Sequence, residues 1–176
     1  MSESASGLAG VPDGLQRLWT PHRMAYIDSS QSPGAMECPF CLTSDSGNED
    51  SLVVARGQFC FVVLNLFPYN PGHLLICPYR HVGDYTNLTQ DETCEVASLT
   101  QQAMKTLRAG FNPTGFNIGI NQGDAGGAGI VDHFHQHVVP RWKGDANFFP
   151  IIAQTKALPQ LLGETRDSLA SLWERL

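Results

Sequence analysis

The chain has 176 residues, of which 42% are hydrophobic and 16% are charged, and its formal net charge is −6. This length and composition are typical of one folded domain with its own core, and they argue against a disordered chain. Lys and Arg total only 11 and form no run, which argues against a binder of polymeric nucleic acid. An anionic small molecule is not excluded, because a few oriented N–H groups can hold a phosphate.

The N-terminal residues MSESASGLAG lack the basic and apolar regions of a secretory signal, and no stretch reaches the roughly 18 apolar residues of a membrane span. We therefore expect a cytoplasmic protein that is not embedded in a membrane. Residues 1–14 are expected to be a flexible segment, and residues 15–176 a single domain. The five cysteines, an odd number, argue against a secreted disulfide framework.

The first half of the chain predicts a β-hairpin after a long irregular region. Short helical turns are expected over 15–27. Residues 28–51, rich in Ser, Gly, Asp and Pro, are predicted to be a loop that Cys-Pro-Phe-Cys interrupts. Two β-branched and aromatic runs, 59–68 and 73–78, flank the turn sequence YNPG and predict the hairpin.

The second half predicts a helix, two strands and a final helix. Thr89 and Glu92 fit a capping box at the start of a helix that should end at Gly110. Alternation predicts a strand over 115–123, then a glycine-rich loop, then a strand of about seven residues that contains three histidines. A last helix should begin near Pro159 and carry an apolar stripe: Leu162, Leu169, Leu172, Trp173 and Leu176. This order predicts an α+β fold, with an antiparallel sheet, helices packed on one side and a C-terminal helix.

Three histidines, His133, His135 and His137, occupy every second position of the segment DHFHQHV. A strand would place all three on one face, at intervals of about 6.5–7 Å. A histidine-rich surface strand is one interpretation. A three-histidine metal site is another, although the outer Cα atoms would be about 13 Å apart. In the third, a neutral imidazole attacks phosphorus and forms a phosphoramidate that an acceptor later breaks.

Cys38 and Cys41 have a spacing that occurs both in redox motifs and in one half of a tetrahedral zinc site. A redox motif requires a strand before the pair and a helix that starts at it and lowers the thiol pKa. The sequence after Cys41, LTSDSGNED, has the composition of a loop. Zinc is therefore the preferred interpretation, and a pair of reduced thiols without a metal is the alternative.

The segment HFHQHVV resembles the His-φ-His-φ-His-φ-φ motif of the histidine triad (HIT) superfamily of nucleotide hydrolases and transferases, except that Gln136 takes a usually apolar position. LNLFPYNPGHLLICPYRHV and NIGINQGDAGGAGIVDH resemble the core hairpin and the phosphate loop of that family, in the same order. The resemblance covers residues 38–142. The flanking segments are similar to the bacterial diadenosine tetraphosphate phosphorylase branch.

The resemblance implies nucleotidyl transfer from dinucleoside polyphosphates, such as diadenosine tetraphosphate, through a covalent nucleotidyl-histidine intermediate. A phosphorylase is favoured. The alternatives are a dinucleoside polyphosphate hydrolase, a purine nucleoside phosphoramidase, and a non-catalytic nucleotide-binding protein. The resemblance also implies a homodimer or higher homo-oligomer, and Mg²⁺ could accompany the substrate.

The resemblance also assigns roles to individual residues. His135 is the expected nucleophile, and His137 is expected to hold the phosphate through a ring N–H. Asn65 is expected to bind the ribose hydroxyls, and Asn121 to orient the nucleotide near the phosphates. Both asparagines have an ordinary alternative, which is to satisfy a strand end or a turn.

The loop before the triad is expected to present the backbone N–H groups of Gly129 and Ile130 to the α-phosphate. Many family members have Ser or Thr where this chain has Ile130, so a hydroxyl contact to the phosphate or the leaving group is missing. A backbone group or another part of the site must replace it.

The resemblance completes a structural zinc site with two distant histidines. The four expected ligands are Cys38, Cys41, His81 and His133. His73 is expected to cap or pack, and His22 to lie at the surface.

Overall fold

The computed structural model describes residues 38–45, 51–145 and 160–176. The predicted flexible segment 1–14, the predicted helical turns over 15–27 and His22 lie outside these residues. All described residues belong to one compact unit of the chain. None of the helices in this part of the chain is long and apolar enough to cross a membrane.

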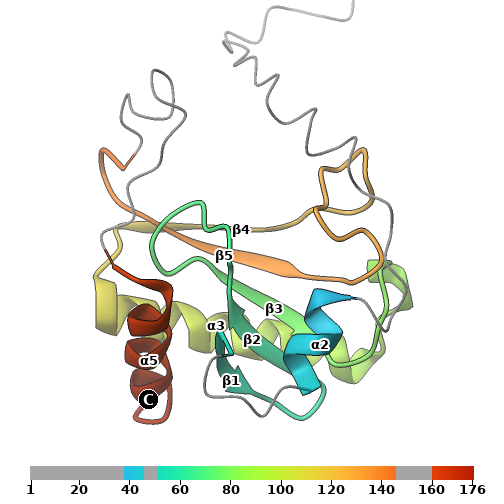
Figure 1. Cartoon of the computed structure of the whole chain (residues 1–176), viewed down its shortest axis with the longest axis horizontal. Coiled ribbons are helices and arrows are strands. Elements are labelled where there is room, and N and C mark those ends of the chain that lie inside the picture. Colours follow the sequence, from blue (N-terminus) through green and yellow to red (C-terminus); the bar gives the residue numbers. More distant parts are fainter. Residues whose placement is uncertain (1–37, 46–50, 146–159) are drawn as a thin grey trace, which may run out of the picture. The chain divides into compact units, whose positions relative to one another are not determined.

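An antiparallel sheet of five strands organises this unit (Figure 1). In spatial order the strands are β1 (Val53–Arg56), β2 (Cys60–Leu64), β3 (Leu74–Pro78), β5 (Gln136–Arg141) and β4 (Gly115–Ile120). The hairpin predicted from 59–68 and 73–78 is confirmed as β2 and β3, with shorter strands. β1 escaped prediction because its four residues are too few to display a clear alternation.

Two long helices, α3 (Gln90–Phe111) and α5 (Leu162–Trp173), pack against the strands and against each other (Figure 1). The predicted capping box is present, since the Thr89 hydroxyl accepts the Glu92 N–H at 3.2 Å and the Glu92 carboxylate accepts the Thr89 N–H at 2.8 Å. α3 ends one residue beyond the predicted Gly110. The predicted α+β fold, with an antiparallel sheet and a C-terminal helix, is confirmed.

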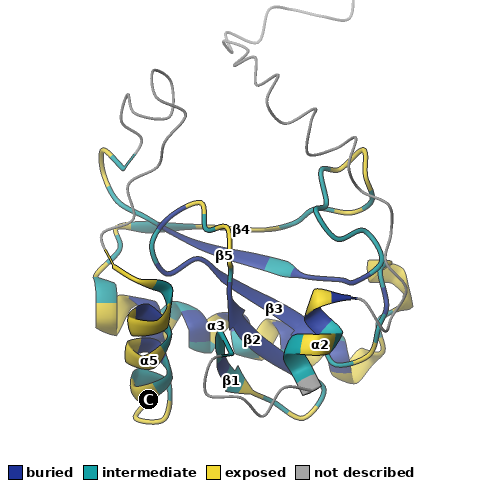
Figure 2. Cartoon of the chain, in the orientation of Figure 1, coloured by how far each residue is buried: buried dark blue, intermediate teal, exposed yellow. Residues whose placement is uncertain are grey.

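The sheet has a buried cluster on each face, and β2 and β3 are buried along their whole length (Figure 2). One cluster joins the strands to α3 and α5 through Val62, Leu107 and Leu169. The other joins Val63 to Phe40, from the segment before β1. Successive residues of β2 therefore face different layers, as the pleat of a strand requires.

The apolar stripe predicted for the last helix is confirmed in part. Leu169 is buried, and Leu162 and Trp173 pack against the same cluster. Leu176 lies beyond the end of α5 and is 61% exposed, so its place in the stripe was a wrong prediction.

A short helix, α2 (Pro39–Asp45), replaces part of the loop predicted over 28–51. Pro39 begins it, at a position where a proline without an N–H costs nothing. The Leu42 N–H donates to the Cys38 carbonyl at 3.0 Å and closes the first turn. The polar composition after Cys41 suggested a loop, but burial of Phe40 against the sheet favours the helical turn.

The histidine segment is also less regular than predicted, because β5 begins only at Gln136 and so His133 and His135 precede it. Before that point the chain pairs with another loop, where the Phe134 N–H donates to the Val82 carbonyl at 2.6 Å. The predicted alternation holds nevertheless, since Phe134 and Val138 lie in the cluster with the helices. The three histidines therefore project from the opposite side of the chain.

Candidate functional site

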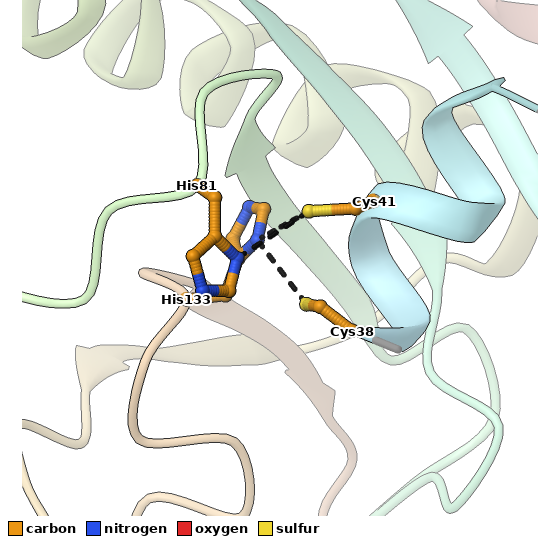
Figure 3. Close-up of side chains that lie close together, drawn as sticks. All are labelled: Cys38, Cys41, His81 and His133. Atoms are coloured by element: carbon orange, nitrogen blue, oxygen red, sulfur yellow. Dashed lines mark hydrogen bonds between the residues drawn. The ribbon is translucent and has the colours of Figure 1, made fainter. Parts of the chain in front are cut away.

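Four side chains from three separate parts of the chain converge at one point (Figure 3). They are Cys38 and Cys41 at α2, His81 in the loop after β3, and His133 before β5. One ligand atom from each lies within 4.8 Å of all the others. The structure therefore brings together the four residues that were expected from the sequence to lie close to one another.

The distances within this cluster fit a tetrahedral metal. The Sγ of Cys38 lies 3.4 Å from the His133 Nδ1, and the Sγ of Cys41 lies 3.4 Å from the His81 Nδ1. In a tetrahedral zinc site with ordinary Zn–S and Zn–N lengths, a sulfur and a nitrogen are roughly 3.6 Å apart. The cluster therefore needs little movement to hold zinc.

His133 presents the correct nitrogen to the cluster. Its Nε2 lies 3.0 Å from the carbonyl of Pro78, an acceptor, so this nitrogen carries the proton and Nδ1 is left with a lone pair. Burial lowers the pKa of His133 to about 4, which keeps the ring neutral. A hydrogen bond from the distal ring nitrogen of this kind orients most metal-binding histidines.

The ring of His135 is also held in one tautomer. Its Nδ1 lies 2.9 Å from the backbone carbonyl of His133, so Nδ1 carries the proton and Nε2 has the lone pair. The side chain is buried, and burial lowers the pKa of His135 below its ordinary value of 6.5. A neutral imidazole with a free Nε2 is a competent nucleophile near neutral pH.

The tautomer of His137 follows from a chain of hydrogen bonds that starts at a backbone amide. The Tyr69 N–H donates to the His73 Nδ1 at 3.0 Å, which leaves the proton of His73 on Nε2. That Nε2 lies 2.9 Å from the His137 Nδ1, so it donates there and the His137 proton is placed on its own Nε2. The His137 Nε2 is buried and has no hydrogen-bond partner among the described residues. His137 therefore offers one ring N–H to a ligand.

The glycine-rich loop leaves backbone donors unused. Neither the N–H of Gly129 nor that of Ile130 finds an acceptor in the described part of the chain. The Ile130 side chain packs against the apolar cluster beside α2. Its backbone N–H is therefore the polar group that Ile130 can offer to a ligand. A bound anion would satisfy such N–H groups.

The two asparagines already have partners within the protein. The Asn65 Oδ1 accepts the Phe67 N–H at 3.0 Å, and its Nδ2 lies 3.3 Å from the His73 Nδ1. The Asn121 Nδ2 reaches the Gly127 carbonyl at 3.4 Å. These contacts match the alternative role of stabilising a turn, and the nucleotide contacts of both residues stay predictions.

A model of the HIT domain matches residues 46–144. The chain belongs to the HIT domain family. Its sequence is 46% identical over 175 residues to the AP-4-A phosphorylase of Mycobacterium tuberculosis (strain H37Rv), a match that spans 94% of this chain and 88% of that protein. It is 34% identical over 88 residues to the bis(5'-adenosyl)-triphosphatase of Dictyostelium discoideum, which spans 50% of this chain and 58% of that protein.

Solved structures of the HIT family share this fold. A Zn-bound histidine triad family protein from Mycobacterium smegmatis superposes with a TM-score of 0.64 at 28% sequence identity, and the match spans 81% of this chain and 96% of that one.

His73 of this HIT domain has a contact to the triad that its sequence position did not indicate. It was expected to cap or pack, yet it is fully buried and connects the Tyr69 backbone to His137. Its position just after the hairpin turn carried no signal of a contact 64 residues away.

Of the two alternatives to the catalytic interpretation of the three histidines, the histidine-rich surface strand is wrong, because all three triad histidines are buried.

Proposed function

We propose that this HIT protein is a nucleotidyltransferase that splits dinucleoside polyphosphates, with inorganic phosphate as the preferred acceptor. The observation that carries the proposal is the pair of opposite tautomers in the triad. His135 presents a lone pair at Nε2, and His137 presents an unpartnered N–H at Nε2. One group can attack phosphorus, and the other can donate a hydrogen bond to an oxygen of the same phosphate.

In the first step the His135 Nε2 attacks the α-phosphorus of the substrate. An N–P bond forms, and the P–O bond to the remaining nucleotide breaks, with the electron pair leaving on the polyphosphate oxygen. The ring becomes a cation whose Nδ1–H still points at the His133 carbonyl. That carbonyl stabilises the positive charge as it develops.

In the second step an oxygen of the acceptor attacks the same phosphorus and the N–P bond breaks, which regenerates the neutral ring. Phosphate as acceptor converts diadenosine tetraphosphate into ADP and ATP, whereas water gives AMP and ATP. The AP-4-A phosphorylase relative, at 46% identity over 94% of this chain, supports the phosphorylase. The shorter match to a bis(5'-adenosyl)-triphosphatase makes the hydrolase the second candidate.

The test is to incubate the full chain with diadenosine tetraphosphate, with and without inorganic phosphate, and to identify the products. ADP with ATP, formed only when phosphate is present, supports the phosphorylase. AMP with ATP identifies the hydrolase, and faster turnover of an adenosine phosphoramidate identifies a phosphoramidase. Acid quenching during turnover should trap a nucleotide on the protein.

The matched variants are His135→Ala, which removes the proposed nucleophile, and Cys94→Ala, at an exposed position on α3. We expect no covalent nucleotide and no turnover from His135→Ala, and unchanged turnover from Cys94→Ala. Full activity of the His135→Ala variant would refute the mechanism. Nucleotide binding without any trapped nucleotide in the unmodified chain would favour a non-catalytic binding protein.

We also propose that zinc occupies the cluster of Cys38, Cys41, His81 and His133, as the distances and the Zn-bound relative support. All four positions would be filled by protein atoms, so the metal would have a structural role. Mg²⁺ would enter only with the polyphosphate, and its need is checked by assaying with and without added Mg²⁺. The cytoplasmic location stays a prediction.

Finally, we propose a homodimer formed through β4, which lies at the edge of the sheet. An edge strand has unpaired backbone groups that a second copy can satisfy. Ile118 on this strand is 46% exposed. Light scattering should show that Ile118→Asp dissociates the dimer, whereas Leu42→Asp, at a 58% exposed position on α2, leaves it intact.

A further inference from the structure

A groove extends from the triad along the sheet in the direction of β5. It has a volume of about 340 Å³, and its lining includes Tyr69, Asn117, Gly119, His137, Val139 and Arg141. Gly119 pairs with His137, and Asn117 pairs with Val139. His137, Val139 and Arg141 alternate along β5, so they share the face that carries the triad. The groove is therefore a continuation of the triad surface.

Hydrogen-bond donors dominate the polar groups of this groove. The Arg141 guanidinium has five N–H groups. Three of them donate hydrogen bonds of 2.6 to 2.8 Å, two to the Asp145 carboxylate and one to the Asn117 Oδ1. Two N–H groups remain without a partner among the described residues. The Asn117 Oδ1 accepts a bond from Arg141, and its Nδ2 donor has no partner among the described residues.

Two more donors complete the set. The Tyr69 ring stacks on the His137 ring, with centroids 5.8 Å apart, and its hydroxyl has no partner in the described part of the chain. The His137 Nε2 is buried and unpartnered as well.

Asp145 is the one carboxylate among the described lining residues, and donors within the protein already engage it. Asp145 accepts four bonds, which come from Arg141, from the Asn70 side chain and from the Trp142 N–H, and three of them go to Oδ2. It holds the guanidinium in place and compensates part of its charge. A surface with several donors that have no partner in the described part of the chain favours an anion rich in oxygen.

The Arg141 guanidinium lies nearer to the triad than its place on β5 suggests. Its Nη1 is 2.6 Å from Asn117, which pairs with Val139 only two residues from His137. Two residues of a strand span about 6.5 Å. The Arg141 and Asn117 donors are thus about one strand repeat from His137, a position suited to phosphates next to the one that His137 is proposed to hold.

We infer that this groove binds the phosphate groups beyond the transferred one, an inference that rests on the proposed function. In each displacement at phosphorus, the bonds to the attacking and leaving atoms are roughly in line. The leaving polyphosphate departs opposite to His135, and the acceptor enters along the same path. The same donors of Asn117, Arg141 and Tyr69 then serve the leaving polyphosphate in the first step and inorganic phosphate in the second.

The test uses three variants of the full chain: Asn117→Ala, Tyr69→Phe and Arg141→Gln. The matched control is Arg80→Gln, because Arg80 also holds a carboxylate, Glu92, at 2.7 Å and has a similar exposed fraction of 48% against 42% for Arg141. Each variant is assayed with diadenosine tetraphosphate, and separately with an adenosine phosphoramidate, whose leaving group has no phosphate. Circular dichroism checks that each variant is folded.

We expect the three groove variants to lose about 10- to 100-fold in kcat/KM for diadenosine tetraphosphate and to keep their kcat/KM for the phosphoramidate. A raised KM for inorganic phosphate, at an unchanged rate of discharge by water, identifies the acceptor as an occupant. Slower trapping of the nucleotidyl enzyme identifies the leaving polyphosphate. Either result supports the groove as an oxyanion site.

Equal losses on both substrates, or no loss on either, would overturn the inference. Failure of the proposed function looks different, because the unmodified chain would then form neither a trapped nucleotide nor products. The Arg80→Gln control should match the unmodified chain on both substrates.

Discussion

The Nδ1–H of His135 donates a hydrogen bond of 2.9 Å to the backbone carbonyl of His133. The bond connects the proposed nucleophile directly to a proposed zinc ligand. Phe40, between the two cysteines, adds a second connection, with its ring centroid 5.3 Å from that of His133 and 5.2 Å from that of His135. A displacement of α2 or of His133 would therefore also displace the nucleophile.

Removing one zinc ligand should affect both stability and turnover. We expect Cys41→Ser to lose the bound zinc, to unfold at a lower temperature, and to lower kcat about 10- to 100-fold because the His133 carbonyl shifts. Zinc content, thermal unfolding and kcat are measured on the same preparation. Cys94→Ser is the control, since Cys94 is exposed on α3. A Cys41→Ser protein with full zinc content would contradict the proposed ligand set.

Substituting His73 tests whether it positions His137. His73→Phe keeps an aromatic ring but removes the donor to the His137 Nδ1, so His137 can adopt the other tautomer. We expect kcat to fall about 10- to 100-fold with little change in KM. His73→Gln, whose amide can still donate, should recover part of the loss. Equal kcat values for His73→Phe and the unmodified chain would show that the hydrogen bond has no positioning role.

The stability of the fold should decrease in mild acid because of His137. Burial lowers its pKa from 6.5 to about 4, so the unfolded chain binds a proton that the folded chain does not. The stabilising contribution of the neutral ring is complete above pH 6.5 and is lost as the pH falls from 6.5 toward 4. His137 alone should cost about 2 kcal/mol between pH 7 and pH 5.

Urea unfolding at these two pH values, on the unmodified chain and on His137→Gln, isolates this contribution. The variant should lose less stability on acidification, by about 2 kcal/mol. The same pH dependence in both proteins would assign the acid sensitivity to other groups.

Glu95 should stabilise the β1–β2 turn. From α3 its carboxylate accepts the backbone N–H groups of Gln58, Phe59 and Cys60, at 2.6 to 2.8 Å. We expect Glu95→Ala to lower the free energy of unfolding by about 2–4 kcal/mol, since charge-assisted bonds are lost and donors are left unpaired. Urea unfolding measures the change. Glu174→Ala, at an exposed position after α5, should change stability by less than about 0.5 kcal/mol.

Local patterns were sufficient for the elements whose signals are short-range. The turn YNPG between two apolar runs predicted β2 and β3, and the Thr89 and Glu92 pair predicted the start of α3. α2 was missed because its helical turn depends on the burial of Phe40 against residues far along the chain. The start of β5 was misplaced because Phe134 pairs with the Val82 loop instead of β3.

In the sequence, the spacing of the three histidines indicated that they share one side of the chain. Together with the hairpin and loop segments that precede them, this spacing also indicated the family and the candidate zinc ligands. Only the tertiary structure decided which ring nitrogen of each histidine carries a proton. Those protons are placed by the carbonyls of His133 and Pro78 and by the amide of Tyr69 through His73. Such contacts span up to 64 residues and depend on how strands and loops pack, which no local periodicity records.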